Sequence, residues 1–168
     1  MKLIMSPPSP FARKARVLLR ETGLIDRVEE IEISTTPLAS DAQILAANPT
    51  GKIPALIRED GPAIYDSRVI TRQVDDIADA ELYPVNSLCE ILTLEATADG
   101  IMEIAVGMAY DTRFRPDQQS PDWTEAQWGL PPIHTLRRRR PTLSTTRTVP
   151  THLYTTLHIH THSTPSTL

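Results

Sequence analysis

The sequence predicts an α/β fold followed by helical material, and three observations support this prediction. Short apolar runs alternate with helical patterns over residues 1–79, in the order β-α-β-α-β-β-α. Helical periodicity without strands follows over residues 87–129, and no period is sustained over residues 130–168. We therefore expect one α/β domain, a linker at residues 80–86, a partial all-α domain and a tail.

The first strand and the first helix have clear boundaries. Leu3 to Met5 is a short apolar run that Ser6-Pro7-Pro8 closes, which favours a buried strand over a helix. Ser9 is a preferred N-cap residue and Pro10 suits the first helical position. Apolar residues then recur at helical spacing until Gly23, so we predict a helix that ends there.

The middle of the domain supplies the remaining strands. Val28 to Ile33 partly alternates apolar and acidic residues, as a strand near a sheet edge does, and Leu38 to Ala47 has a weaker helical pattern. Pro54 to Ile57 and Ala63 to Tyr65 flank the turn signature Asp60-Gly61. The last two segments are therefore expected to pair as an antiparallel hairpin.

The predicted helices beyond the hairpin differ in character. Ser67 is expected to cap a helix that runs to about Ala78 with its apolar residues on one face, completing a mixed sheet covered by helices. After the linker, Leu88 to Ala109 has apolar residues at mixed three and four spacing, which predicts a long, mostly buried helix. Ser120-Pro121 starts another helix, which we expect to be cut short at Trp128-Gly129.

The charge distribution separates the tail from the rest of the chain. The 168 residues carry a net charge of −4, but residues 1–129 alone carry −9, and residues 130–168 contain five arginines and no acidic residue.

The single cysteine, Cys89, rules out an intramolecular disulfide within the chain. It lies in an apolar run, so a buried and inert thiol is expected, with a reactive thiol as the alternative. The first residues do not resemble a signal peptide, and no apolar run approaches the length of a membrane span.

The tail at residues 130–168 is expected to be disordered. It contains eleven threonines, five prolines and all five histidines of the chain, and so abrupt a change of composition suggests an out-of-frame origin. Arg137 to Arg140 lack interleaved aromatic residues, so binding to nucleic acid or to an acidic membrane is not expected. His158, His160 and His162 suit adventitious metal binding, and no physiological metal site is predicted.

Three spaced elements carry the chemistry of the α/β domain. They are Ser9-Pro10-Phe11-Ala12-Arg13-Lys14, the stretch Asn48-Pro49-Thr50-Gly51-Lys52-Ile53-Pro54-Ala55-Leu56, and Asp66-Ser67. Together they resemble the glutathione site of glutathione S-transferases, and most closely that of bacterial members with a serine at the start of the first helix. The resemblance covers roughly residues 1–129. It implies a thioredoxin-like N-terminal domain and a C-terminal domain that is truncated here.

The resemblance assigns the catalytic role to Ser9. A glutathione thiol has a pKa of about 8.5, so a site that uses its thiolate must favour the anion. The hydroxyl of Ser9 would donate a hydrogen bond to the sulfur, with help from the N-terminus of the helix. The alternative is that Ser9 only caps the helix. Arg13 and Lys14 are expected on a solvated face of this helix.

The other two elements would bind the rest of the tripeptide. In the thioredoxin-like fold the proline that matches Pro54 is cis, which would let Ile53 N–H and C=O pair with the cysteinyl backbone; an ordinary trans proline is the alternative. Lys52 would meet the glycyl carboxylate or would simply be solvated. Asp66 would hold the γ-glutamyl ammonium, and Ser67 the adjacent carboxylate, although a capped helix alone also explains Ser67.

Because neither a signal peptide nor a membrane span is predicted, we expect a cytoplasmic protein. The resemblance implies a detoxification enzyme that transfers alkyl or aryl groups other than methyl. Glutathione would be the co-substrate, a small electrophile the second substrate, and a homodimer the assembly; no metal, nucleic acid or membrane partner is implied. Because the helical domain is expected to be incomplete, enzymatic activity is left open. The alternative is a thioredoxin-like module that binds glutathione or a peptide without turnover.

Overall fold

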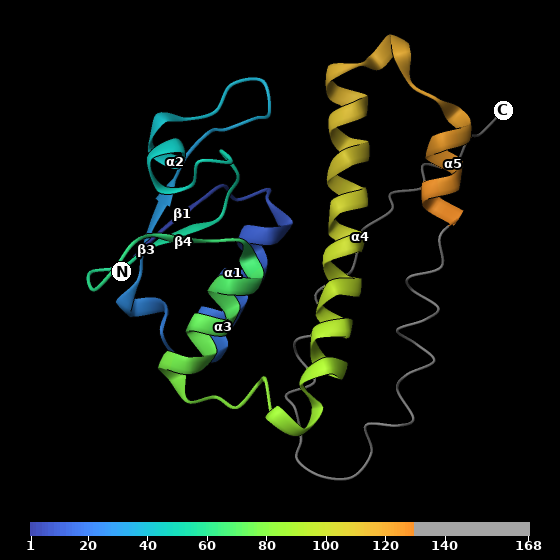
Figure 1. Cartoon of the computed structure of the whole chain (residues 1–168). Coiled ribbons are helices and arrows are strands. Elements are labelled where there is room, and N and C mark those ends of the chain that lie inside the picture. Colours follow the sequence, from blue (N-terminus) through green and yellow to red (C-terminus); the bar gives the residue numbers. More distant parts are fainter. Residues whose placement is uncertain (130–168) are drawn as a thin grey trace, which may run out of the picture. The chain divides into compact units, whose positions relative to one another are not determined.

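The computed structural model describes residues 1–129, and its elements follow the predicted order. The strands and helices are β1 (Lys2–Met5), α1 (Pro10–Glu21), β2 (Glu29–Glu32), α2 (Ala42–Ala47), β3 (Ala55–Ile57), β4 (Ile64–Tyr65), α3 (Ser67–Ala78), α4 (Leu88–Phe114) and α5 (Pro121–Gly129). The order β-α-β-α-β-β-α over the first domain is thus confirmed. Helical structure alone follows it to the end of the described residues (Figure 1).

The four strands form one mixed sheet in the order β2-β1-β3-β4. β1 is parallel to β2, because the helical crossover α1 returns the chain in the same direction. β1 is antiparallel to β3, and β3 is antiparallel to β4, which a short turn joins to it. This is the thioredoxin-like arrangement with two central strands, β1 and β3.

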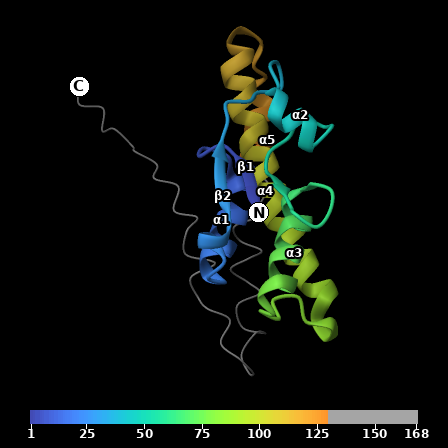
Figure 2. The same cartoon turned by 90° about the vertical axis from the view of Figure 1, so that its left-hand side faces the viewer.

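The sheet buries both faces, and the alternation of side chains in β1 decides which residue faces which layer. Leu3 and Met5 belong to the larger apolar cluster, which α1 and α3 cover. Ile4, between them, belongs to a smaller cluster with Ile44 of α2 and Ala55. Figure 1 shows α1 and α3 between the strands and α4, and the turned view in Figure 2 shows α2 well separated from α1.

Helix α1 has the boundaries that its sequence predicts. Oγ of Ser9 accepts a hydrogen bond from the N–H of Ala12 at 3.2 Å, and Pro10 opens the helix. At the other end Gly23 has a φ of 70°, and Leu24 N–H donates to the carbonyl oxygen of Leu19 at 2.8 Å. These are the features of a glycine-terminated helix, in which glycine adopts the left-handed conformation at little cost.

Helix α2 is shorter than predicted. It begins at Ala42 rather than at Leu38, because Asp41 caps it through a hydrogen bond from Gln43 N–H to Oδ1 at 2.7 Å. Leu38 lies instead in a turn closed by Thr36 and Ala39, and its side chain is 76% exposed. Its apolar character therefore does not reflect a place in the core.

Helix α4 differs from its prediction in burial. It extends to Phe114, beyond the predicted end at Ala109, but its only buried residues are Asp99 and Asp111. The expectation of a mostly buried helix is wrong for the part of the chain that the structure describes, in which its apolar side chains are half-buried or exposed. Cys89 is exposed, so the buried thiol is also wrong. None of the helices within residues 1–129 is both long and apolar enough to cross a membrane.

Candidate functional site

The strand register brings the three predicted elements to one edge of the sheet. Ile4 pairs with Ala55, so the carboxyl end of β1 adjoins the amino end of β3. Ala55 also pairs with Tyr65, so the carboxyl end of β4 lies at the same edge. The segments that follow β1, precede β3 and follow β4 are those that contain Ser9, Pro54 and Asp66. One sheet edge therefore carries two helix N-termini and a proline-bearing bend.

Ser9 is the N-cap of α1, as predicted. Its backbone is extended, with φ −72° and ψ 120°, and its Oγ accepts the hydrogen bond from Ala12 N–H. A hydroxyl that accepts one bond still has its own proton to donate. Among the described residues this O–H has no acceptor, so the capping role leaves its donor function available.

The bend before β3 is held by Asn48, which is buried. Nδ2 of Asn48 donates to the carbonyl oxygen of Lys52 at 2.7 Å, and its Oδ1 accepts from N–H and Oγ1 of Thr50 at 3.0 and 2.8 Å. The Ile53-Pro54 peptide bond is cis, as the resemblance implied. Ile53 has no backbone hydrogen bond to another residue of the described chain. The bend thus presents its N–H and C=O for pairing with a ligand backbone.

Lys52 and Ser67 occupy different environments. The side chain of Lys52 is exposed, and the structure records no ion pair for it within residues 1–129. Ser67 is buried and is the first residue of α3. The prediction that Ser67 caps this helix is wrong, because the residue before it takes the capping position.

Asp66 is the N-cap of α3 and has the left-handed φ of 68°. Its Oδ1 accepts from the N–H of Arg68 at 2.9 Å, which is the capping bond. The Arg68 guanidinium also forms a bidentate ion pair with the carboxylate, at 2.9 and 2.7 Å. These hydrogen bonds from Arg68 lower the pKa of Asp66 to about 2. The carboxylate is ionised at neutral pH and fixed at the sheet edge.

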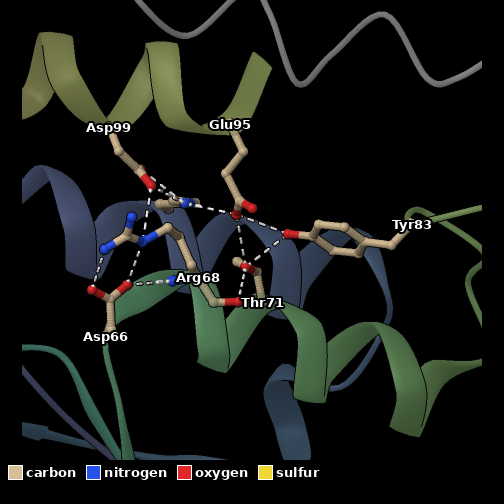
Figure 3. A network of polar contacts seen from close by, with 7 residues as sticks. Asp66, Arg68, Thr71, Tyr83, Glu95 and Asp99 are labelled. Atoms are coloured by element: carbon tan, nitrogen blue, oxygen red, sulfur yellow. Dashed lines mark hydrogen bonds and ion pairs between the residues drawn. The ribbon is translucent and has the colours of Figure 1, made fainter. Parts of the chain in front are cut away.

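A network of polar contacts joins this edge to α4 (Figure 3). Lys14 Nζ lies 2.8 Å from Oδ1 of Asp99 and 2.8 Å from Oε1 of Glu95. Nε of Arg68 lies 3.7 Å from Oδ2 of Asp99. Burial raises the pKa of Asp99, against the opposing effect of its hydrogen bond from Lys14. The expectation that Lys14 lies on a solvated face is therefore wrong, whereas Arg13 is exposed as predicted.

A second branch of the network reaches the linker. Oε1 of Glu95 accepts hydrogen bonds from Oγ1 of Thr71 at 3.0 Å and from the hydroxyl of Tyr83 at 2.8 Å. Burial raises the pKa of Tyr83, and its ring lies 4.4 Å from the guanidinium carbon of Arg72. Tyr83 lies within residues 80–86, which the sequence predicts only as a linker. The structure makes it part of the contact between the linker and α4.

One feature of the sequence of α4 could have predicted this network. Glu95 and Asp99 are acidic residues four positions apart in a helical run that is mostly apolar, which places both on one face of the helix. Charged residues on the buried face of a helix need partners, and cations on the preceding helices are the candidates. Lys14 and Arg68 could have been selected in this way.

No group of three or more potential metal ligands occurs among residues 1–129. Arg137 to Arg140 and His158, His160 and His162 lie outside the described residues, as does the predicted disordered tail. The helix that begins after Ser120 is present as α5, and the N–H of Trp123 donates to Oγ of Ser120 at 3.3 Å.

The fold and the sheet edge define a thioredoxin-like domain with a serine-capped first helix, and comparison with known proteins agrees. The family model "Glutathione S-transferase, N-terminal domain" matches residues 8–77. The uncharacterised GST-like protein YibF of Escherichia coli K12 is 35% identical over 126 residues, which are 73% of this chain and 60% of that protein.

Solved structures of bacterial proteins are similar as well. A glutathione transferase family member from Pseudomonas fluorescens Pf-5, with bound glutathione, has a TM-score of 0.67 and 37% identity over 82% of this chain and 66% of its own. A glutathione S-transferase from Methylobacillus flagellatus KT with glutathione bound has a TM-score of 0.64 and 31% identity, over 84% of this chain and 68% of its own. The chain belongs to the glutathione S-transferase family. It covers about two thirds or less of the length of these relatives.

Proposed function

We propose that the chain binds glutathione at the sheet edge formed by Ser9, the Lys52-Ile53-Pro54 bend and Asp66-Ser67. The single observation that carries this proposal is the register, which joins Ala55 to both Ile4 and Tyr65 and so gathers the three segments. The relatives from P. fluorescens and M. flagellatus, solved with bound glutathione, support the same ligand.

Each segment has a distinct role in this proposal. Ser9 O–H donates to the glutathione sulfur and stabilises the thiolate, while Oγ keeps its bond to Ala12 N–H. Ile53 N–H and C=O pair with the cysteinyl backbone, and Lys52 meets the glycyl carboxylate. The ionised Asp66 attracts the γ-glutamyl ammonium, and the N-terminus of α3 at Ser67 attracts the γ-glutamyl α-carboxylate.

We further propose that the bound thiolate attacks an electrophilic carbon of a small molecule. The sulfur electron pair forms a C–S bond, and in an aryl halide the carbon–halogen bond breaks and halide leaves. Ser9 acts as an electrostatic stabiliser in this step and forms no covalent bond. Residues 1–79 would hold glutathione, and residues 87–129 would contribute to the electrophile side. A cytoplasmic detoxification role and a homodimer accompany this proposal as family expectations.

The test compares binding with turnover on the full chain. Isothermal titration with glutathione measures binding, and loss of thiol with a chlorodinitrobenzene measures conjugation. Binding together with release of chloride supports the transferase. Binding without turnover identifies a non-catalytic glutathione-binding module, and absence of glutathione binding overturns the proposal.

A further inference from the structure

The contact between α4 and the thioredoxin-like domain is made largely by charged side chains. The two buried residues of α4 are aspartates, and Asp111 pairs with Arg115, the C-cap residue of the same helix. Asp99 is therefore the buried residue of α4 that faces the first domain, and Glu95 lies one turn before it. A helix that docks through carboxylates needs cations on the surface that receives it.

Lys14 is the cation placed between these two carboxylates. Its Nζ lies 2.8 and 3.1 Å from the two oxygens of Asp99 and 2.8 Å from Oε1 of Glu95. The side chains are 19%, 5% and 8% exposed for Lys14, Asp99 and Glu95. Arg68 is a second cation near Asp99, but it is 51% exposed and its guanidinium is already bidentate to Asp66. The close and sheltered partner of the pair is Lys14.

The charges of this cluster are unequal. Asp66, Glu95 and Asp99 carry three negative charges against the two positive charges of Lys14 and Arg68. Oε2 of Glu95 is buried and has no hydrogen-bond partner among the described residues. Removal of one partner from a buried ion pair is strongly destabilising, because the remaining charge stays buried without compensation. The two kinds of partner therefore differ. Loss of Lys14 leaves Glu95 without a cation and Asp99 with only the more distant Arg68, whereas neutralisation of Asp99 leaves Lys14 paired one to one with Glu95.

We infer that Lys14 is a positioning residue that clamps α4 to the thioredoxin-like domain through Glu95 and Asp99, and that the glutathione site requires the clamped arrangement. Lys14 lies on α1, which Ser9 caps, and Thr71 of α3 bonds to the same oxygen of Glu95. The clamp thus holds the two helices whose N-termini form the sheet-edge site. The second clause rests on the proposed function, whereas the first does not.

The first test is backbone hydrogen exchange of α4 in the full chain, compared between wild type and Lys14→Met. Methionine keeps the apolar stem and the helix propensity but removes the charge. We expect α4 amides to exchange at least about tenfold faster, while β1 and β3 amides change less than twofold. Lys14→Arg should restore most of the protection. Arg16→Met is the matched control on the same helix, because Arg16 pairs with Glu30 within the first domain. Unchanged α4 exchange in Lys14→Met overturns the clamp, as does an equal loss in Arg16→Met.

A second variant, Asp99→Asn, tests the clamp even if Lys14→Met does not fold. Asp99→Asn keeps the shape of the side chain and removes the excess negative charge. We expect α4 protection within about threefold of wild type or higher, because the remaining ion pair is balanced. A tenfold loss of protection in Asp99→Asn would mean that losing one acid costs as much as losing the lysine, and would overturn the inference that α4 depends on Lys14 as the central partner of the cluster.

Glutathione binding tests whether the site requires the clamped arrangement. If binding requires the clamped arrangement, a bound ligand must in turn stabilise that arrangement. At free glutathione about ten times Kd, α4 exchange in the wild type should slow by about tenfold. Unchanged α4 exchange with glutathione bound, as titration calorimetry would detect, refutes the link between clamp and site. Absence of any glutathione binding instead refutes the proposed function, and the clamp is then tested by hydrogen exchange in the Lys14 and Asp99 variants alone.

Discussion

Replacing Ser9 by alanine separates the two roles that its hydroxyl can have. The cap is the bond from Ala12 N–H to Oγ at 3.2 Å, and removal of a serine cap costs about 1 kcal/mol of unfolding free energy. The thiolate role is a charge-assisted hydrogen bond of roughly 1.5 to 3 kcal/mol. Since one pKa unit is about 1.4 kcal/mol, the thiol pKa of bound glutathione should rise by about one to two units in Ser9→Ala.

The assay is the ultraviolet absorbance of the thiolate, titrated against pH in the binary complex, with urea unfolding measured in parallel. Ser9→Asp is the informative companion, because aspartate also caps helices but brings a negative charge to the sulfur. It should recover the unfolding free energy without recovering the low thiol pKa. Ser6→Ala is the matched control, a nearby hydroxyl whose removal should leave both quantities unchanged. A thiol pKa that is the same in wild type and Ser9→Ala would sink the thiolate role and leave Ser9 as a cap alone.

The remaining predictions concern the site loops and the helices. The hydrogen bonds from Arg68 lower the pKa of Asp66 from 3.8 to about 2, so the stability that Asp66 contributes is complete at pH values above its ordinary pKa and is lost as the pH falls toward 2. The unfolding free energies of wild type and Asp66→Asn in urea should therefore converge over that pH range, and a constant difference between them would contradict the ion pair. Asn48→Ala removes the buried donor to Lys52 C=O and should cost about 1 to 3 kcal/mol by chemical denaturation, with weaker glutathione binding than in an exposed control, Gln43→Ala. Gly23→Ala should destabilise the protein by about 1 to 2 kcal/mol because φ is 70° there. Gly100→Ala lies within α4 and has open space around its Cβ position, so it should stabilise the protein by about 0.5 to 1 kcal/mol. Melting temperatures that change in the same direction in the two variants would refute the argument from backbone conformation.

The parts of the fold that local chemistry determines could be predicted from the sequence. The N-cap at Ser9, the proline after it and the glycine after α1 act within a few residues of one another, so both ends of this helix were predicted correctly. Leu38 was misread because its apolar side chain was taken as helical, whereas Asp41 holds the stronger capping signal. Capping at Asp66 rather than Ser67 has the same origin, since both residue types are good caps.

The non-local part of the site could not be derived from the residues alone. The gathering of Ser9, Pro54 and Asp66 depends on which strands pair and in which register, and a family resemblance rather than a sequence pattern suggested it. The half-buried position of Lys14 depends on Glu95 and Asp99 of α4, which lie more than eighty residues further along the chain. A lysine beside an arginine on an amphipathic helix is normally solvated, and only the facing carboxylates make this one different.

The order of the strands also bears on self-association. β2 is the outermost strand on one side of the sheet, and three of its four residues are glutamates. β4 is the outermost strand on the other side and has two residues. A strand from another copy that added to β2 would meet these charged side chains, two of which pair with Lys2 and Arg16, and β4 offers too short a ladder to hold one. Extension of the sheet from molecule to molecule is therefore disfavoured at both edges. When two copies of the chain associate, helices rather than strands should form the contact.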